Sequence, residues 1–336
     1  MPARRPGLRV VILGGSGFVG LNIAEALLRR GHDVLCIDRA PLPAAASLAF
    51  RALPGRLETA IADVTEPALL RAMLPPGADA LVAGAAITPG PAREARDPES
   101  LLAVNLGAMP GILRAARAAG LRRVIHLSSA AAYGAAPERA VLSETDPARP
   151  QRIYGITKLA SEWAGERLAE LWDLDFLSLR LSTVFGPWEY ATGLRDTMSP
   201  PYQILRAAAR GEAALLPRVG LRDWLYAPDA ARAVCHLLEA GTARHSLYNL
   251  TFPGRWSLLE WGEAVARLRG QGFACRLAAP GEAPNIDLYA VSDRAPLDPA
   301  RLREEFGWQA RHGLRESARH LEAWWRRHGG AMLDAA

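Results

Sequence analysis

The stretch LRVVILGGSGFVG, residues 8–20, decides the fold of this chain. Its first half is a short apolar run rich in β-branched residues, which predicts a buried strand. A glycine-rich turn follows at once, and a helical pattern begins near residue 18. The turn matches G-x-G-x-x-G through Gly15, Gly17 and Gly20, and such glycines let the backbone approach a pyrophosphate held at the helix N-terminus. The expected cofactor-binding residues of this turn are Gly14, Gly17, Phe18, Val19 and Gly20.

The segments that follow repeat this alternation of apolar strand and amphipathic helix. Continuous apolar strands separated by helices predict a parallel sheet that is covered on both faces. This is the doubly wound α/β fold, or Rossmann fold, which binds ligands at the carboxyl ends of its strands. Strands are expected over 8–14, 33–38, 57–63, 80–86, 122–129 and 175–181, with helices near 18–30, 66–74, 98–119 and 154–171.

The character of the sequence changes near residue 187, where a Pro-, Gly- and aromatic-containing loop begins. The segments expected after it are helices over 201–210, 228–240, 257–268, 298–306 and 313–328 and strands over 213–216 and 245–250. We therefore expect a dinucleotide-binding domain over 1–187 and a smaller C-terminal lobe, mainly substrate-binding, over 188–336. The segment 228–250 is expected to return to the first domain.

Acidic residues at the strand ends indicate which dinucleotide binds. Asp38 ends the second predicted strand, where a carboxylate can bond both hydroxyls of the adenosine ribose and would repel a 2′-phosphate. NAD is therefore expected in preference to NADP, although Arg39, the next residue, leaves NADP open. Asp63 ends the third strand, and it either lies beside the adenine or caps the helix that begins near Glu66.

Bulk composition excludes several classes of protein. Of 336 residues, 50% are apolar and 22% are charged, as in an ordinary globular protein. No apolar run is long enough to span a membrane, and the basic N-terminal segment is interpreted as leading into the first strand rather than as a signal peptide, so a cytoplasmic location is expected. The chain has three cysteines, an odd number without C-x-x-C spacing, which argues against a disulfide framework and a zinc site. The histidines show no H-E-x-x-H spacing, which also argues against a metal site.

The net charge of +5 raises the question of nucleic acid. The arginines are interspersed with acidic residues rather than gathered in blocks, which is typical of a solvated surface. No recognised nucleic-acid-binding module is present, so we expect no nucleic-acid partner. A basic face can still bind an anionic small molecule.

The pentapeptide YGITK holds the only lysine of the chain, whereas the other 39 of the 40 basic residues are arginine. Lys158 follows Tyr154 by one helical turn, so the two side chains share a face. A nearby ammonium favours the phenolate of a tyrosine, whose ordinary pKa is about 10. Lysine is also a compact donor that can reach a ribose hydroxyl, where the wide arginine fork would not fit. An exposed helix pair is the alternative, but the dinucleotide motif favours the functional interpretation.

Together these motifs resemble the extended short-chain dehydrogenase/reductase family of NAD-dependent sugar epimerases and dehydratases. The matching segments are GGSGFVG, Asp38, Asp63-Val64, VAGAA, VNLGAMPGILRAAR, SSAAAYG, YGITK, LRLSTVFGP, RDWLYAPDAARAV and FGW, which together extend over nearly the whole chain. The resemblance implies that Tyr154 is the acid/base and that Lys158 tunes it and binds the nicotinamide ribose. Ser129, or alternatively Ser128, would bond the reacting oxygen. Val64, Ala85 and Asn105 would line the cofactor, with Asn105 tying a helix to the sheet.

Departures from the family pattern limit the reaction. Ala130 and Ala131 stand where related dehydratases carry an acidic pair and related decarboxylases a glutamate, so both reactions are disfavoured because alanine transfers no proton. No cysteine occupies a strand end of the pocket, which disfavours inversion beside a ketone. Hydride transfer remains, either as net oxidation or reduction or as 4-epimerisation.

The substrate is less defined. Arg222 resembles a pyrophosphate clamp of nucleotide-sugar enzymes, with an ion pair to Asp223 or Asp229 as the alternative. Thr183 replaces an asparagine usual in the family, and Arg294 is only a possible second phosphate ligand. A nucleotide sugar is expected; a free sugar, sugar acid or small hydroxy-acid is the rival, and a non-catalytic NAD-binding regulator is a further alternative. The candidate substrate contacts are Thr88, Ser128, Thr183, Arg195 and Arg222.

Apolar residues also recur along the helix that begins at Tyr154, at Ile156, Leu159, Ala160, Trp163, Ala164, Leu168 and Leu171. This stripe is wider than one contact with a sheet requires. Members of the family similarly dimerise through this helix and the one near 98–119. A homodimer is therefore expected, and packing on the sheet alone is the alternative.

Overall fold

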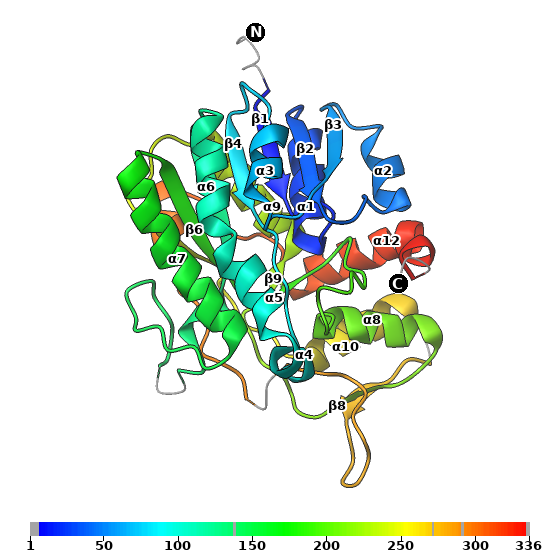
Figure 1. Ribbon diagram of the computed structural model, residues 1–336. Helices are drawn as coiled ribbons and strands as arrows, with labels where there is room; N and C mark the ends of the chain where they lie inside the picture. The colour runs from blue at the N-terminus through cyan, green and yellow to red at the C-terminus, as the bar shows by residue number, and fades with distance from the viewer. Residues whose placement is uncertain (1–6, 137–138, 271, 290–291, 334–336) are drawn as a thin grey trace.

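The computed structural model describes residues 7–136, 139–270, 272–289 and 292–333 (Figure 1). The basic segment 1–6, which was compared with a signal peptide on the basis of its sequence, lies outside the described residues.

In this part of the chain a seven-stranded sheet forms the centre, in the order β10-β6-β5-β4-β1-β2-β3, and every neighbouring pair is parallel. Its strands are β1 (Arg9–Leu13), β2 (Asp33–Asp38), β3 (Leu57–Ile61), β4 (Ala80–Ala83), β5 (Arg123–Ser129), β6 (Asp175–Leu181) and β10 (Leu247–Leu250). The central strands are apolar on both faces because helices cover both, so the predicted doubly wound sheet is confirmed.

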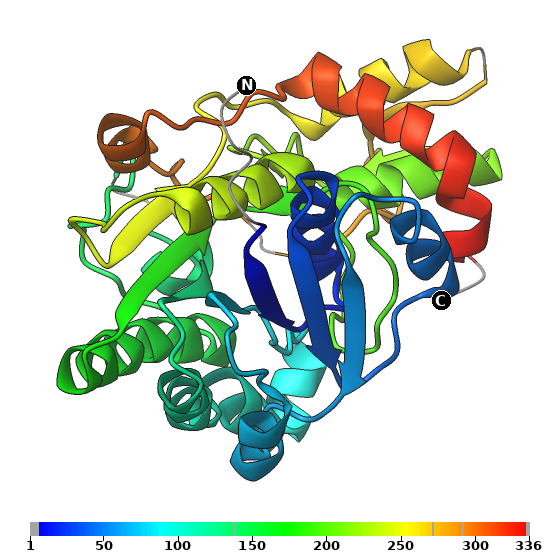
Figure 2. The same ribbon diagram turned by 90° about the horizontal axis from the view of Figure 1, so that it is seen from above.

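Two helix layers enclose the sheet, as Figure 2 shows from above. One layer contains α1 (Phe18–Arg29) and α9 (Ala227–Glu239), which pack against each other. The other contains α3 (Pro67–Met73), α6 (Met109–Ala118) and α7 (Ile153–Trp172), each packed against the next. Separate apolar clusters lie under the two layers. The segment from 228 to 250 thus supplies one covering helix and the edge strand β10.

The helix expected over 98–119 is interrupted. It consists of α5 (Pro98–Leu102), a π-helical turn over Ala103–Gly107, and α6, and it follows the short α4 (Pro91–Arg96). The turn places Asn105 at the loop after β4, where its side chain accepts from the N–H of Ile87 at 2.8 Å and donates to the Ile87 carbonyl at 2.9 Å. The pattern of apolar residues does not reveal this break, because the break serves contacts with a distant loop. The short helix α2 (Ala44–Phe50) was also not expected.

A smaller lobe lies at the carboxyl ends of the strands, at the bottom of Figure 1. It contains α8 (Pro200–Arg210), α10 (Leu258–Arg269) and two small parallel sheets, β7 (Val184–Phe185) with β9 (Leu225–Tyr226) and β8 (Ala214–Leu216) with β11 (Cys275–Leu277). Its core is aromatic, with Phe185 packed edge-on against Trp256 and Trp261. The chain continues through α11 (Ala300–Phe306) and α12 (Leu314–Leu333), and Trp325 of α12 packs against Tyr202. The lobe therefore forms the second wall of a cleft over the strand ends.

Candidate active site

A cavity of about 940 Å³ lies between the strand ends and the lobe. Its walls bring together most of the residues that the sequence singled out, although they come from distant parts of the chain. The predicted residues lining it are Gly14, Gly17, Phe18, Val19, Gly20, Asp38, Arg39, Val64, Ala85, Thr88, Ser128, Ser129, Tyr154, Lys158, Thr183, Arg195 and Arg222. Asp63 and Asn105 are not among the lining residues.

The glycine turn has the shape that a bound pyrophosphate requires. Gly14 has a φ of +81°, and a Cβ there would lie 2.7 Å from the amide nitrogen of Ala85. A Cβ at Gly20 would lie 2.1 Å from the Gly14 carbonyl oxygen. No side chain caps the N-terminus of α1 at Gly17, and its first turn holds no acidic residue. The residues therefore fit a dinucleotide, because the turn and the first residues of the helix line the cavity and no side chain caps the N-terminus of the helix.

Asp38 lies beside this turn at the end of β2. Its carboxylate accepts from the backbone N–H of Ser16 at 3.0 Å and of Ala40 at 3.3 Å. Burial raises the pKa of Asp38, and the backbone hydrogen bonds oppose that rise. Ser16, which the sequence did not single out, thus fixes the orientation of the candidate ribose ligand.

Asp63 closes a local turn before α3. Its Oδ1 accepts from the N–H of Thr65 at 2.9 Å and from the Thr65 hydroxyl at 2.7 Å, whereas the N-cap of α3 is Glu66 and receives no side-chain cap. Its other oxygen lies 3.4 Å from Nε of Arg39. Arg39 is exposed, and its side chain leans toward Asp63 rather than toward Asp38.

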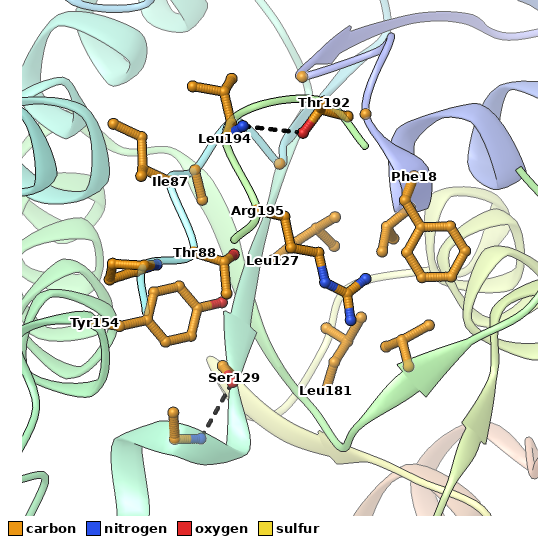
Figure 3. A pocket seen from close by; sticks show the side chains of 18 of the residues that line it. Phe18, Ile87, Thr88, Leu127, Ser129, Tyr154, Leu181, Thr192, Leu194 and Arg195 are labelled. Carbon is orange, nitrogen blue, oxygen red and sulfur yellow. Dashed lines mark hydrogen bonds between the residues drawn. The ribbon is translucent and has the colours of Figure 1, made fainter. Parts of the chain in front are cut away.

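Tyr154 projects from the first turn of α7 into the cavity, with Thr88, Ser129 and Arg195 around it (Figure 3). Burial raises the pKa of Tyr154, while hydrogen bonds with Ser129 and Thr88 and the charge of Arg195 lower it. The sequence assigned the tuning of this tyrosine to Lys158 alone. In the structure the charge that lowers the pKa of the phenol is that of Arg195, which comes from a segment outside the parallel sheet.

Lys158 lies one turn further along α7 and is only 3% exposed. Its Nζ donates to the carbonyl oxygen of Leu127 at 2.8 Å and lies 5.8 Å from the centre of the Tyr154 ring. Burial lowers the pKa of Lys158 to about 8, and the charge of Glu162 raises it. The ammonium is thus held between the end of β5 and the tyrosine, at the edge of the cavity.

Behind the end of β5 lies a buried network that the sequence analysis missed. The hydroxyl of Ser128 donates to Glu162, and Arg180 makes a two-pronged contact with the same carboxylate, at 3.1 Å from Nε and 2.6 Å from Nη2. The Arg180 guanidinium also lies 4.3 Å over the ring of Tyr133. Ser128 lines the cavity, but its hydroxyl is directed into this network. The four-residue spacing of Glu162 after Lys158 was the signal that could have revealed it.

The segment 187–197, here called the strap, crosses from one wall of the cavity to the other. On one side the Tyr190 hydroxyl donates to the carbonyl of Ser16 at 2.7 Å, and the Asn22 amide donates to the carbonyl of Pro187 at 2.8 Å. On the other side the N–H of Thr88 donates to the carbonyl of Leu194 at 2.8 Å. The strap therefore joins the glycine turn to the loop after β4 across the expected cofactor position.

Two arginines that line the cavity, Arg222 and Arg294, are both ion-paired. Arg222 pairs with Asp293 at 3.0 Å and donates to the hydroxyl of Thr183 at 3.3 Å, so its partner is neither Asp223 nor Asp229. Arg294 instead pairs with Asp223 at 3.0 Å. Burial lowers the pKa of Arg222, an effect reinforced by the nearby Arg294 and Arg218 charges.

The described residues contain no group of His, Cys, Asp and Glu side chains that could hold a metal ion. Among the same residues, no helix is both long and apolar enough to cross a membrane.

Known proteins share both this sequence pattern and this architecture. The NAD dependent epimerase/dehydratase family matches residues 10–250. UDP-glucose 4-epimerase of Corynebacterium glutamicum is 26% identical over 322 residues, covering 91% of this chain and 92% of its own. The dTDP-6-deoxy-L-talose 4-dehydrogenase (NAD(P)(+)) of Kitasatospora kifunensis is 29% identical over 318 residues, covering 93% and 94%.

Among solved structures, MoeE5 in complex with UDP-glucose and NAD is 27% identical, with a TM-score of 0.75 over 95% of this chain and 99% of that one. The resemblance drawn from the motifs is thereby confirmed. This chain belongs to the NAD-dependent epimerase/dehydratase family.

Proposed function

We propose that the chain is a nucleotide-sugar 4-epimerase that works by NAD-dependent hydride transfer. The observation that carries the proposal is the placement of Tyr154, Ser129 and Lys158 in one cavity with the glycine turn, while Ala130 and Ala131 supply no further acid or base. NAD, when bound, accepts a hydride from the sugar carbon and returns it.

The residues of the chain handle the proton. Tyr154 takes the proton of the sugar hydroxyl as its carbon is oxidised to a ketone, and it returns the proton when the carbon is reduced on the other face. Ser129 donates to the same oxygen and stabilises the charge that develops there. Lys158 holds the ribose and keeps a positive charge near the phenolate. Glycines of the turn and Asp38 position the dinucleotide, whereas Arg222 and Arg294 face the substrate pyrophosphate.

The strap supports epimerisation over net oxidation. A redox-neutral cycle needs no exchange of cofactor, whereas a dehydrogenase must release NADH after each turnover. Hydrogen bonds from both walls hold the strap across the expected cofactor position. The relatives named above include a UDP-glucose 4-epimerase and a 4-dehydrogenase, so the test must distinguish epimerisation from net oxidation.

The test uses the purified full chain with NAD at a tenth of the substrate concentration. UDP-glucose and UDP-glucuronic acid are offered, the configuration at C4 is followed by NMR, and NADH by its absorbance. Conversion far beyond the amount of NAD, without NADH accumulation, is expected. NADH formed in step with product would instead establish a dehydrogenase, and Tyr154→Phe serves as the inactive control.

The division into an NAD-binding domain over 1–187 and a substrate lobe over 188–336 forms part of this proposal, as do the homodimer and the cytoplasmic location. Support for the lobe comes from its separate aromatic core and from the cavity between it and the strand ends.

A further inference from the structure

An arginine occupies the middle of the cavity. Arg195 extends from the strap into the space between Tyr154 and Phe18 (Figure 3), and its guanidinium carbon lies 5.5 Å from the Phe18 ring centre. Its side chain is 20% exposed, so it faces the cavity and not bulk solvent. The glycine motif and the Tyr154–Lys158 pair do not account for a cation at this position.

The guanidinium is held in place from one side. Nε donates to the carbonyl of Thr197 at 3.0 Å, and Nη2 donates to the hydroxyl of Tyr289 at 2.9 Å. Nη1 lies 3.1 Å from the carboxylate of Glu189. Hydrogen bonds occupy two of the five N–H donors of the arginine and the ion pair with Glu189 engages Nη1, so the described residues do not use every donor of the guanidinium.

Glu189 positions the arginine and does not itself face a ligand. Its side chain is fully buried, and its carboxylate accepts from the N–H and from the hydroxyl of Ser199, each at 2.6 Å. An arginine fixed in this way loses little entropy when it binds a planar anion through two parallel hydrogen bonds. The remaining donors therefore suit a carboxylate.

The position of Arg195 relative to Tyr154 limits where that carboxylate sits on the substrate. The charge of Arg195 acts on the Tyr154 phenol, so both groups share one chamber. The sugar carbon oxidised at Tyr154 must lie there too, so the substituents on the carbons next to it would be the ones nearest to Arg195. In a hexose that reacts at C4, the C6 group is carried by the adjacent C5.

We propose that Arg195 binds a carboxylate at C6, so that the substrate is a nucleotide-linked uronic acid rather than a neutral nucleotide hexose. The inference rests on the proposed function and names its substrate class. A phosphate of the cofactor is the competing anion, because Phe18 begins the helix at the glycine turn.

The test compares UDP-glucuronic acid with UDP-glucose on the NAD-loaded wild type, by calorimetric affinity and by kcat/KM. A preference of roughly 10- to 100-fold for the uronic acid is expected from one charge-assisted pair. Equal affinity for the two sugars would overturn the inference, whatever the behaviour of any variant. If the uronic acid binds tightly but neither sugar reacts, the proposed reaction fails while the carboxylate subsite stands.

Variants then assign the preference to the residue. Arg195→Gln should remove the preference and leave the NAD affinity within a few-fold, and Arg195→Lys should retain part of it. Arg93→Gln is the matched control, since Arg93 holds the strap through Asp196 at 3.0 Å and the carbonyl of Gly193 but does not line the cavity. An equal loss in Arg93→Gln, or a matching loss of NAD affinity in Arg195→Gln, would overturn the assignment. Should Arg195→Gln fail to fold, Tyr289→Phe removes a single anchor and should weaken the preference.

Discussion

Glu162 and Arg180 form a buried ion pair, 2.6 Å between Oε2 and Nη2, directly behind the strand end that carries Ser128 and Ser129. The two side chains are 6% and 3% exposed. Removing one partner of such a pair leaves a buried charge uncompensated and costs about 3–5 kcal/mol. The pair thus links the stability of the sheet to the geometry of the site.

We predict that Glu162→Gln lowers the free energy of unfolding by an amount near that range, measured by denaturant titration. The matched control is Glu170→Gln on the same helix, because Glu170 pairs with Arg167 at 2.6 Å but both side chains are largely exposed. The control should change stability by less than about 1 kcal/mol. Similar small losses in both variants would show that the buried pair contributes no more than the exposed one.

Cofactor choice depends on Asp38. Asp38→Ala removes a charged acceptor for the ribose hydroxyls and should weaken NAD binding by about 1–3 kcal/mol. Titration of NAD and NADP into wild type and variant measures this. Asp33→Ala, at the opposite end of the same strand, is the control and should leave the affinity unchanged. Tighter binding of NADP by the wild type would refute the prediction and turn attention to Arg39.

The substrate pyrophosphate is assigned to Arg222. Arg222→Ala should raise KM far more than it changes the NAD affinity, because the residue lines the cavity from the segment between β8 and β9 and not from the glycine turn. The exposed Arg276, paired with Glu282 at 2.6 Å, supplies a control variant that should alter neither quantity. An equal loss of NAD affinity in Arg222→Ala would mean that its pair with Asp293 serves only the structure.

The features predicted from the sequence are those that depend on residues close together in the chain. The turn at Gly14 and the pair Tyr154 and Lys158 follow from spacing within a few residues, and the parallel sheet follows from continuous apolar strands. The contact of Tyr190 with Ser16, separated by 174 positions, and the pair of Arg222 with Asp293, separated by 71, depend on how the lobe folds back. Neither leaves a periodic signal in the sequence.

The interruption at Asn105 shows the same limit within a helix. The sequence predicts one helix over 98–119 because its apolar periodicity continues. The side chain of Asn105 instead bonds both backbone groups of Ile87, and the helix widens locally to bring it there. A tertiary contact thus overrides a local preference, and it does so in the loop that leads to Thr88.

The homodimer can be tested on the exposed face of α7. Trp163 is 63% exposed, Leu171 57% and Ile156 44%, and Leu102 of the neighbouring α5 is 45% exposed. Trp163→Glu should convert a dimer to a monomer by placing a charge in an apolar contact. Leu48→Glu on α2, at a residue 71% exposed, is the control and should leave the mass unchanged. The molar mass is measured by light scattering at micromolar concentration, and a monomeric mass for the wild type would refute the dimer.

The last prediction concerns the pH dependence that Lys158 imposes. Burial lowers the pKa of Lys158 to about 8, below the 10.5 that is usual for a lysine. Below pH 8 the ammonium of Lys158 is present, so its protonation state should not reduce kcat/KM. As the pH rises through about 8 the charge is lost, and with it the ribose contact and the support of the phenolate, so kcat/KM should fall. Between about pH 8 and 10.5 the unfolded chain binds the proton more tightly than the native state, so this residue's contribution to the free energy of unfolding rises with pH there.

Lys158→Arg separates charge from shape. If charge alone mattered, the variant would be active. Its kcat/KM would also no longer fall near pH 8, because a guanidinium does not titrate there. The slot between the carbonyl of Leu127 and the Tyr154 ring fits a compact ammonium, and a planar fork displaces the ribose. We therefore expect turnover to drop by ~10²–10⁴-fold at pH 7 while NAD still binds through the glycine turn and Asp38. Tyr154→Phe should lose turnover with NAD affinity better preserved. A Lys158→Arg enzyme within a few-fold of wild type would show that the sole lysine serves only as a positive charge.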